Sequence, residues 1–262
     1  MGHRVFLTGA SSGIGEALAQ RFAAQGATLG LLARRGDELE QLRASLPSQA
    51  HAYVADVRDA QRVREAAADF ITRHGVPDLV IANAGIGYGT LTEHPEDLAV
   101  FQDILDTNVM GLVNTMQPFL TPMREQRRGM LVGIASVAGY RGLPGNGAYC
   151  ASKAAAIKYL ESLRVECRGS GVRVVTVCPG YIATPLTARN PFPMPFLLTA
   201  GEFAQRLERA LARRPSQVVI PWQMGLVAKL LTVLPNAIFD AALARMVARK
   251  PRYGEKAPGD PR

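Results

Sequence analysis

Three closely spaced glycines, Gly9, Gly13 and Gly15, follow directly on a short apolar run and open a helical pattern at residues 16–24. A turn whose backbone amides approach a ligand needs residues without a Cβ atom. Gly9 would permit the turn, Gly13 would let a pyrophosphate approach, and Gly15 would let the helix pack on the strand. Three glycines could also serve an ordinary turn. The order of strand, loop and helix nevertheless favours a phosphate site at the N-terminus of the helix.

Apolar runs of strand length alternate with amphipathic helical stretches, such as residues 16–24 and 61–73. Apolar strands separated by helices indicate a parallel sheet that is buried on both faces, with right-handed crossovers. We therefore expect an α/β fold, a Rossmann-type, doubly wound, seven-stranded and mostly parallel sheet with helices on both faces. The expected strands are residues 5–7, 28–32, 52–54, 79–82, 130–134, 173–177 and 218–220.

The chain of 262 residues fits one domain over 1–262, because no linker, repeat or low-complexity tract divides it. Residues 251–262, rich in proline, glycine and charge, are expected to form a loose tail. The three cysteines have no close pair spacing, which argues against a disulfide framework and predicts small buried packing for Cys150 and Cys178. No signal-peptide pattern precedes the first strand, so we expect a cytoplasmic protein.

The net charge of +8 comes from basic residues that mostly stand singly on predicted helix faces. Because no long run of lysine and arginine is present, a solvated basic surface is favoured and no nucleic-acid partner is expected. The four histidines, at positions 3, 51, 74 and 94, are dispersed, and none pairs with a carboxylate or cysteine at the spacing of metal ligands. We expect no metal site.

Two arginines, Arg34 and Arg35, follow the second expected strand, which has no acidic residue at its end. In a dinucleotide site, a carboxylate here accepts a hydrogen bond from a ribose hydroxyl and repels a 2′-phosphate. Guanidinium groups instead hold a phosphate by forked, charge-assisted hydrogen bonds. The pair therefore favours NADP(H) over NAD(H), the alternative being two solvated arginines at the start of a helix.

Tyr149 and Lys153 are four residues apart in a helical pattern, which puts both side chains on one face. A phenol has a pKa of about 10 and is a poor acid–base group at neutral pH. A neighbouring ammonium is expected to lower that pKa. Ser136 ends the fifth expected strand, where parallel sheets bind ligands, and its hydroxyl could stabilise charge on a carbonyl oxygen. Each feature alone is common, but the three together indicate catalysis.

These motifs, in their order and spacing, resemble the short-chain dehydrogenase/reductase family, and the match runs from about residue 4 to about residue 185. The matching positions are Thr8 to Gly15, Asp56, Val57, Asn83, Ala84, Gly85, Asn108, Ser136, Tyr149, Lys153, Pro179, Gly180 and Thr184.

The resemblance implies the catalytic residues Asn108, Ser136, Tyr149 and Lys153. Tyr149 would be the general acid in reduction and the general base in oxidation. Asn108 would hold a water that completes a proton relay through Lys153, which would also bind the ribose hydroxyls of the nicotinamide.

The resemblance also implies a cofactor site. Asp56 and Val57 would contact the adenine, Asn83 would support the sheet, and Arg34 stands where members that prefer NADP carry a basic residue. The expected cofactor-binding residues are Gly9, Ser11, Ser12, Gly13, Ile14, Gly15, Arg34, Arg35, Asp56, Val57, Asn83, Ala84, Gly85, Tyr149, Lys153, Pro179, Gly180, Ile182 and Thr184.

Two segments follow the motifs. Residues at about 185–210 contain several prolines and apolar side chains, and by resemblance they would form a lid over a hydrophobic substrate. Residues at about 222–250 form a helical extension that Pro235 interrupts, with no uninterrupted apolar run long enough to span a bilayer. Its apolar face would pack on the domain or on a second subunit, or lie on a membrane surface.

The sequence thus predicts an NADPH-dependent oxidoreductase that transfers a hydride between nicotinamide and a carbonyl or alcohol group. Its small-molecule substrate would be hydrophobic: a ketone or aldehyde, a steroid- or lipid-like molecule, or a 3-oxoacyl compound. The resemblance implies a homodimer or homotetramer. The alternatives are a non-catalytic NADP-binding sensor or scaffold, and a reductase that associates peripherally with a membrane.

Overall fold

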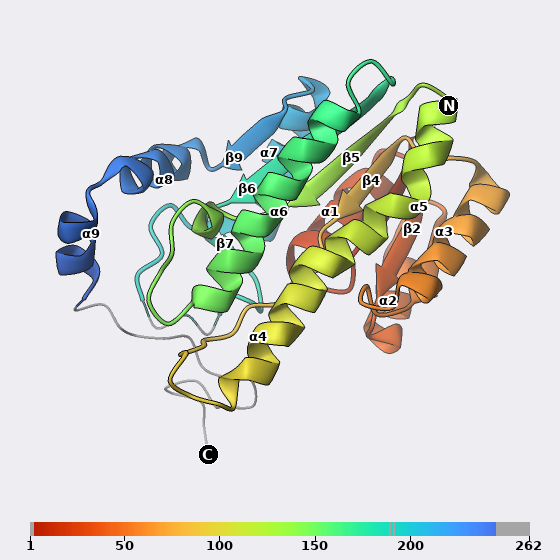
Figure 1. Ribbon diagram of the computed structural model, residues 1–262. Coiled ribbons are helices and arrows are strands. Elements are labelled where there is room, and N and C mark those ends of the chain that lie inside the picture. The colour runs from red at the N-terminus through yellow and green to blue at the C-terminus, as the bar shows by residue number, and fades with distance from the viewer. Residues whose placement is uncertain (1–2, 189, 191, 245–262) are drawn as a thin grey trace.

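The computed structural model describes residues 3–188, 190 and 192–244 (Figure 1). Its main sheet has seven strands in the order β3-β2-β1-β4-β5-β6-β9, and every neighbouring pair is parallel. The expected doubly wound sheet is confirmed, with strand ends within a few residues of those predicted. The strands are β1 (Arg4–Thr8), β2 (Thr28–Ala33), β3 (Ala50–Val54), β4 (Leu79–Ala82), β5 (Gly129–Ile134), β6 (Val172–Pro179) and β9 (Gln217–Ile220).

Helices cover both faces of the sheet, as Figure 1 shows. On one face, α1 (Gly13–Ala23), α2 (Gly36–Ser45) and α7 (Ala200–Ala212) contribute to one apolar cluster. On the other face, α3 (Ala60–His74), α5 (Gly111–Glu125) and α6 (Gly147–Glu166) contribute to a second cluster. The strands are mostly apolar because their side chains alternate between these two buried layers.

The order of the strands reverses beside β1. The chain first adds β2 and β3 on one side of β1 and then crosses to add β4 and the later strands on the other. The loops after β1 and β4 therefore diverge, and a crevice opens at the carboxyl ends of these strands. This crevice is where the glycine loop lies.

The segment predicted as a lid divides into two parts. The first part contains the short parallel pair β7 (Ile182–Ala183) and β8 (Leu198–Thr199). From Ala200 the chain forms α7, which begins with a capping box between Thr199 and Glu202. Phe203 and Leu207 of α7 are fully buried in the core. Residues 200–210 therefore belong to the packed domain, because their apolar positions repeat at helical spacing.

The C-terminal extension contains α8 (Trp222–Val233) and α9 (Asn236–Leu243), and Pro235 lies at the break between them, as predicted. The predicted part beyond Ala244, including the tail at 251–262, lies outside the described residues. Within the described chain, no single helix is long and apolar enough to cross a bilayer. Only α8 and α9 together, bent by 118°, have the length and composition for it.

The remaining helical segments connect the sheet to these layers. They are α4 (Asp97–Leu105), the π-helical turn η1 (Asp106–Met110) and the 3-10 turn η2 (Val137–Gly139). The three cysteines are free and buried, which confirms the packing predicted for Cys150 and Cys178.

Candidate active site

The glycine loop makes the tight turn that its sequence predicts. Gly9 has a φ of +66° and donates its N–H to the carbonyl of Leu32, 2.8 Å away. A Cβ atom on Gly15 would lie 2.0 Å from the carbonyl oxygen of Gly9, so only glycine lets α1 start this close to the end of β1. The N-terminus of α1 consequently opens onto the crevice.

Asn83 holds the two diverging loops together. It follows β4, and its Nδ2 donates to the carbonyls of Thr8 (3.1 Å) and Gly9 (3.2 Å). Its backbone N–H donates to the Thr8 hydroxyl at 3.2 Å. The supporting role that the family resemblance implies for Asn83 agrees with these contacts.

A cavity of about 240 Å³ runs from the glycine loop along the strand ends to Lys153. Among the predicted site residues, Gly15, Asp56 and Asn108 do not line it. The predicted residues that do line it are Gly9, Ser11, Ser12, Gly13, Ile14, Arg34, Arg35, Val57, Asn83, Ala84, Gly85, Ser136, Tyr149, Lys153, Pro179, Gly180, Ile182 and Thr184.

The cavity also has lining residues that the motifs did not predict. They are Leu32, Ala33, Ala55, Ile86, Thr107, Ile134, Ala135, Pro185, Leu186 and Thr187. Most of them directly adjoin a predicted residue at the end of a strand. Extending each motif by one or two positions would therefore have found nearly all of them, including Thr107, which directly precedes Asn108. Thr187 lies one position further away, three residues after Thr184.

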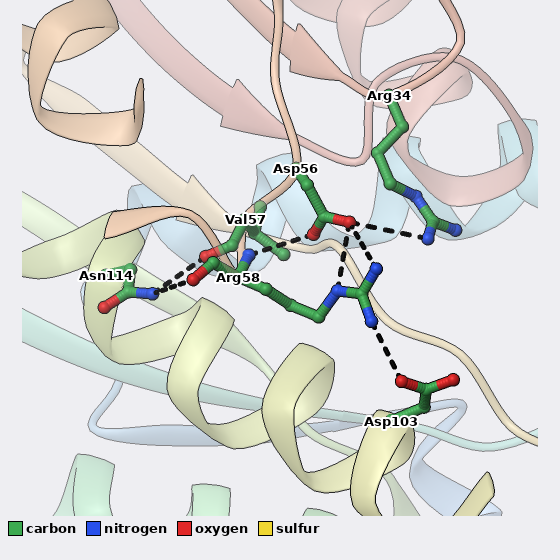
Figure 2. A network of polar contacts seen from close by, with 6 residues as sticks. All are labelled: Arg34, Asp56, Val57, Arg58, Asp103 and Asn114. Carbon is green, nitrogen blue, oxygen red and sulfur yellow. Dashed lines mark hydrogen bonds and ion pairs between the residues drawn. The ribbon is translucent and has the colours of Figure 1, made fainter. Parts of the chain in front are cut away.

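The two arginines lie at the end of the cavity beside β2. Arg35 donates to the hydroxyl of Ser11 at 3.1 Å and so reaches the glycine loop. Arg34 lies 3.7 Å from the carboxylate of Asp56, which in turn is hydrogen-bonded by Arg58 (Figure 2). Exposed guanidinium groups at this end of a cavity provide the charge that a phosphate needs.

The predicted catalytic residues meet at the other end. Ser136 caps η2, and its Oγ accepts the N–H of Ala138 at 3.1 Å, so its hydroxyl hydrogen can donate to another oxygen. Lys153 is buried on α6 and donates from Nζ to the carbonyl of Ile134 at 3.0 Å. The same Nζ lies 5.7 Å from the ring centre of Tyr149. Strand β5 and helix α6 thus bring together the three side chains.

Burial dominates the electrostatics of this group. It raises the pKa of Tyr149 to about 12, although a hydrogen bond with Ser136 acts in the opposite direction. It also lowers the pKa of Lys153 to about 8, against the influence of Cys178. The lowered Tyr149 pKa that the sequence predicts is therefore wrong for this arrangement, because desolvation of a phenolate outweighs its neighbours.

Asn108 lies in the π-helical turn between α4 and α5. Its Oδ1 accepts the N–H of Ile86 at 2.8 Å, and its Nδ2 donates to the carbonyl of Ile86 and to the hydroxyl of Ser152, both at 2.9 Å. The side chain therefore joins the loop after β4 to α6, next to Lys153. π-Helical turns often occur at functional sites. The water relay implied for Asn108 stays a prediction.

A second cavity, of about 190 Å³, adjoins the first and shares with it Ser136, Tyr149, Gly180, Leu186 and Thr187. Its walls come from η2 and the loop after it, from the segment between Tyr181 and Pro195, of which Asn190 and Phe192 are also part, and from α8. Most of them are apolar, among them Val137, Leu143, Tyr181, Leu186, Phe192, Met224, Val227 and Leu231. In the described part of the chain, no group of three His, Cys, Asp or Glu side chains is arranged to hold a metal ion.

Comparisons with known proteins agree with this geometry. The sequence model of the family described as short chain dehydrogenase matches residues 3–192. An uncharacterized oxidoreductase of Myxococcus xanthus is 40% identical, over 94% of this chain and 98% of its own length. The 3-oxoacyl-(acyl-carrier-protein) reductase FabG of Thermotoga maritima is 34% identical, over 71% of this chain and 76% of its own.

A solved structure has a similar fold. The alcohol dehydrogenase of the archaeon Thermococcus sibiricus, complexed with 5-hydroxy-NADP, has a TM-score of 0.72 and 28% identity over 83% of this chain and 95% of its own. Family sequence, fold and the arrangement of Ser136, Tyr149 and Lys153 all agree. The chain belongs to the short-chain dehydrogenase/reductase family of oxidoreductases.

Proposed function

We propose that this protein is an NADPH-dependent reductase of a carbonyl group in a hydrophobic small molecule. The observation that carries the proposal is the position of Tyr149 and Ser136, which line both the cavity beside the glycine loop and the apolar cavity next to it. A group that reaches both spaces can act on a substrate in one while a dinucleotide fills the other.

The residues fit a nicotinamide dinucleotide. The space that Gly9 and Gly13 leave at the start of α1 would take the pyrophosphate. Val57 would lie on the adenine side, and Lys153 would bind the nicotinamide ribose. When bound, NADPH supplies the hydride that reduces the carbonyl carbon. The chain itself must bind the carbonyl oxygen and deliver a proton to it.

Ser136 and Tyr149 would perform that part of the reaction. The Ser136 hydroxyl donates a hydrogen bond to the carbonyl oxygen and stabilises the negative charge that develops on it. Tyr149 is a neutral phenol over the whole physiological range, since its pKa is raised to about 12, and it donates its proton to the same oxygen. The buried Lys153 lies beside the phenol and can supply a new proton to Tyr149 after the first has been donated. In the predicted relay, a water held by Asn108 would in turn supply a proton to Lys153.

Arg34 and Arg35 support the preference for NADPH, because their guanidinium groups lie at the adenosine end of the cavity, where no acidic residue ends β2. The apolar walls of the second cavity support a hydrophobic substrate. A 3-oxoacyl compound, a steroid- or lipid-like molecule and a simple ketone or aldehyde all have this character.

The test is to measure NADPH and NADH binding to the purified protein, followed by NADPH oxidation with apolar ketones, aldehydes and 3-oxoacyl thioesters. Tyr149→Phe should lower turnover at least about 100-fold, because the proton donor is lost. Its NADPH affinity should stay within a few-fold. Turnover equal to that of the unsubstituted protein would contradict the role of Tyr149. Tight binding without turnover of any compound would favour the non-catalytic sensor.

A second copy of the chain is the partner that we propose for α8. Trp222, Leu226, Leu230 and Val233 form a stripe along this helix and are 60% to 75% exposed. Among the described residues, strand β9, directly before α8, has a neighbour on one side only. An exposed strand edge next to an apolar helix face is a surface on which a second protein chain can pair. This favours a homo-oligomer over a membrane surface. The three free cysteines support a reducing, cytoplasmic location.

A further inference from the structure

A carboxylate stands at the rim of the cavity where the 2′-phosphate of NADPH would bind. Asp56 follows β3, and its Oδ2 lies 3.7 Å from the Arg34 guanidinium. Arg34 lines the cavity, and so do Ala55 and Val57, the two neighbours of Asp56 in the chain. Left unpaired, this carboxylate would repel a phosphate and would also draw Arg34 toward itself. A preference for NADPH therefore requires something that neutralises Asp56.

Arg58 occupies both oxygens of Asp56, as Figure 2 shows. Its backbone N–H donates to Oδ1 at 2.9 Å, and its Nε and Nη2 donate to Oδ2 at 3.0 and 2.8 Å. The contact of Arg34 with the same Oδ2 is longer and is not a hydrogen bond. Arg58 thus supplies the hydrogen bonds to Asp56, and Arg34, which lines the cavity, keeps only a longer ion pair with that carboxylate.

Two residues from other elements hold Arg58 in this position. Asp103 on α4 accepts from its Nη1 at 2.9 Å. Asn114 on α5 donates from Nδ2 to the carbonyl of Val57 at 2.9 Å and to that of Arg58 at 3.4 Å, which fixes the loop. The carboxylates at each end of the guanidinium make its orientation specific. An arginine that only solvated the surface would not need such contacts.

We propose that Arg58 is a positioning residue that sets the preference for the phosphorylated cofactor. It neutralises Asp56 and so keeps Arg34 available for the 2′-phosphate. The inference rests on the proposed use of NADPH. The pKa of Asp56 agrees with it: burial acts to raise the pKa, but the hydrogen bonds from Arg58 and the charge of Arg34 lower it overall, so Asp56 is ionised and carries the charge to be neutralised.

The experiment compares dissociation constants for NADPH and NADH, measured on the full chain at low ionic strength. Arg58→Met should weaken the binding of NADPH about tenfold and that of NADH less than about twofold. Only NADPH carries the phosphate that the unpaired carboxylate of Asp56 would repel. Adding Asp56→Asn to Arg58→Met should bring the ratio of the two constants back to within about threefold of its original value. Arg58→Lys, which keeps the charge, should retain most of the preference.

Arg62→Met is the matched control. Arg62 lies four residues further on, and its guanidinium pairs with Glu65 at 3.5 Å. Arg62→Met changes the net charge by the same amount as Arg58→Met, and it should leave the ratio of the NADPH and NADH dissociation constants unchanged. An unchanged ratio in Arg58→Met would overturn the proposal, and so would an equal loss for both cofactors, which is the signature of a merely structural role. Absence of rescue by Asp56→Asn would also overturn it, since Arg58 would then touch the phosphate itself.

The proposed function is tested separately in the same series. The protein without substitutions must bind NADPH more tightly than NADH. The double substitution Arg34→Ala with Arg35→Ala must weaken the binding of NADPH far more than the binding of NADH. If these two results hold and the Arg58 variants do not behave as expected, only the role of Arg58 is lost. If NADPH has no advantage before any substitution, the NADPH proposal itself fails.

Discussion

At the scale of single residues, the active site depends on charged and polar groups that are kept away from water. Lys153 is buried, and its ammonium donates a hydrogen bond to the carbonyl of Ile134. Burial lowers the pKa of Lys153 to about 8 from an ordinary value of 10.5. The site therefore keeps its lysine at a cost in stability, because the folded state disfavours the protonated form that the unfolded chain prefers.

This cost predicts a dependence of stability on pH. Between about pH 8 and pH 10.5 the unfolded chain binds more protons at Lys153 than the folded chain does, so the free energy of unfolding should rise with pH in this range. Between pH 7.5 and pH 9.5, the free energy of unfolding of the protein should rise by about 1–2 kcal/mol relative to that of the Lys153→Met variant. Urea denaturation at these values measures it. Lys158→Met, on the exposed side of the same helix, is the control. Parallel curves for the protein and Lys153→Met would contradict the prediction.

At the scale of elements, two irregular points in regular structure build the site. One is the start of α1, where Gly15 contacts the backbone of Gly9. The other is the π-helical turn between α4 and α5, which turns Asn108 toward the loop after β4. In both places a helix meets the carboxyl edge of the sheet closely enough that an ordinary side chain or an ordinary helical turn would separate them.

Gly15→Ala tests this close contact. The new Cβ would lie 2.0 Å from the carbonyl oxygen of Gly9, so α1 must move away from β1. The substitution should destabilise the protein by about 1–3 kcal/mol and weaken NADPH binding. Gly201→Ala in α7 is the matched control, since its Cβ would meet nothing within 4 Å. That variant should be unchanged or up to about 1 kcal/mol more stable. Thermal unfolding and NADPH titration distinguish the two, and equal behaviour would contradict the close-contact argument.

At the scale of the whole molecule, the domain ends in a helix that is apolar on opposite sides. The inner side of α8 carries Met224 and Ala228, which are buried and line the apolar cavity. The outer side carries the exposed stripe that begins at Trp222. A helix that is apolar all round is normally covered on all sides. The cover that we propose, a second copy, would therefore also support one wall of the substrate cavity.

Leu226→Glu with Leu230→Glu tests the second copy. Sedimentation should find a dimer or tetramer for the unsubstituted protein and a smaller species for the variant, because two carboxylates cannot be buried in an apolar contact. Val54→Glu, an exposed apolar position on β3 at the opposite edge of the sheet, is the control. If the unsubstituted protein is a monomer that floats with anionic phospholipid vesicles, and the double variant does not float, the partner of α8 is a membrane surface.

The amino-acid sequence by itself determined the fold class, the glycine loop and the catalytic trio. These depend on local periodicity and on motifs such as Tyr149 and Lys153, which one helical turn brings together. The tertiary structure decided the rest. It brought Arg34 and Asp103 from other segments to Asp56 and Arg58, assigned residues 200–210 to the core, and reversed the expected pKa shift of Tyr149. The physical reason is that burial and contacts between distant segments set these properties, and neither is written in local spacing.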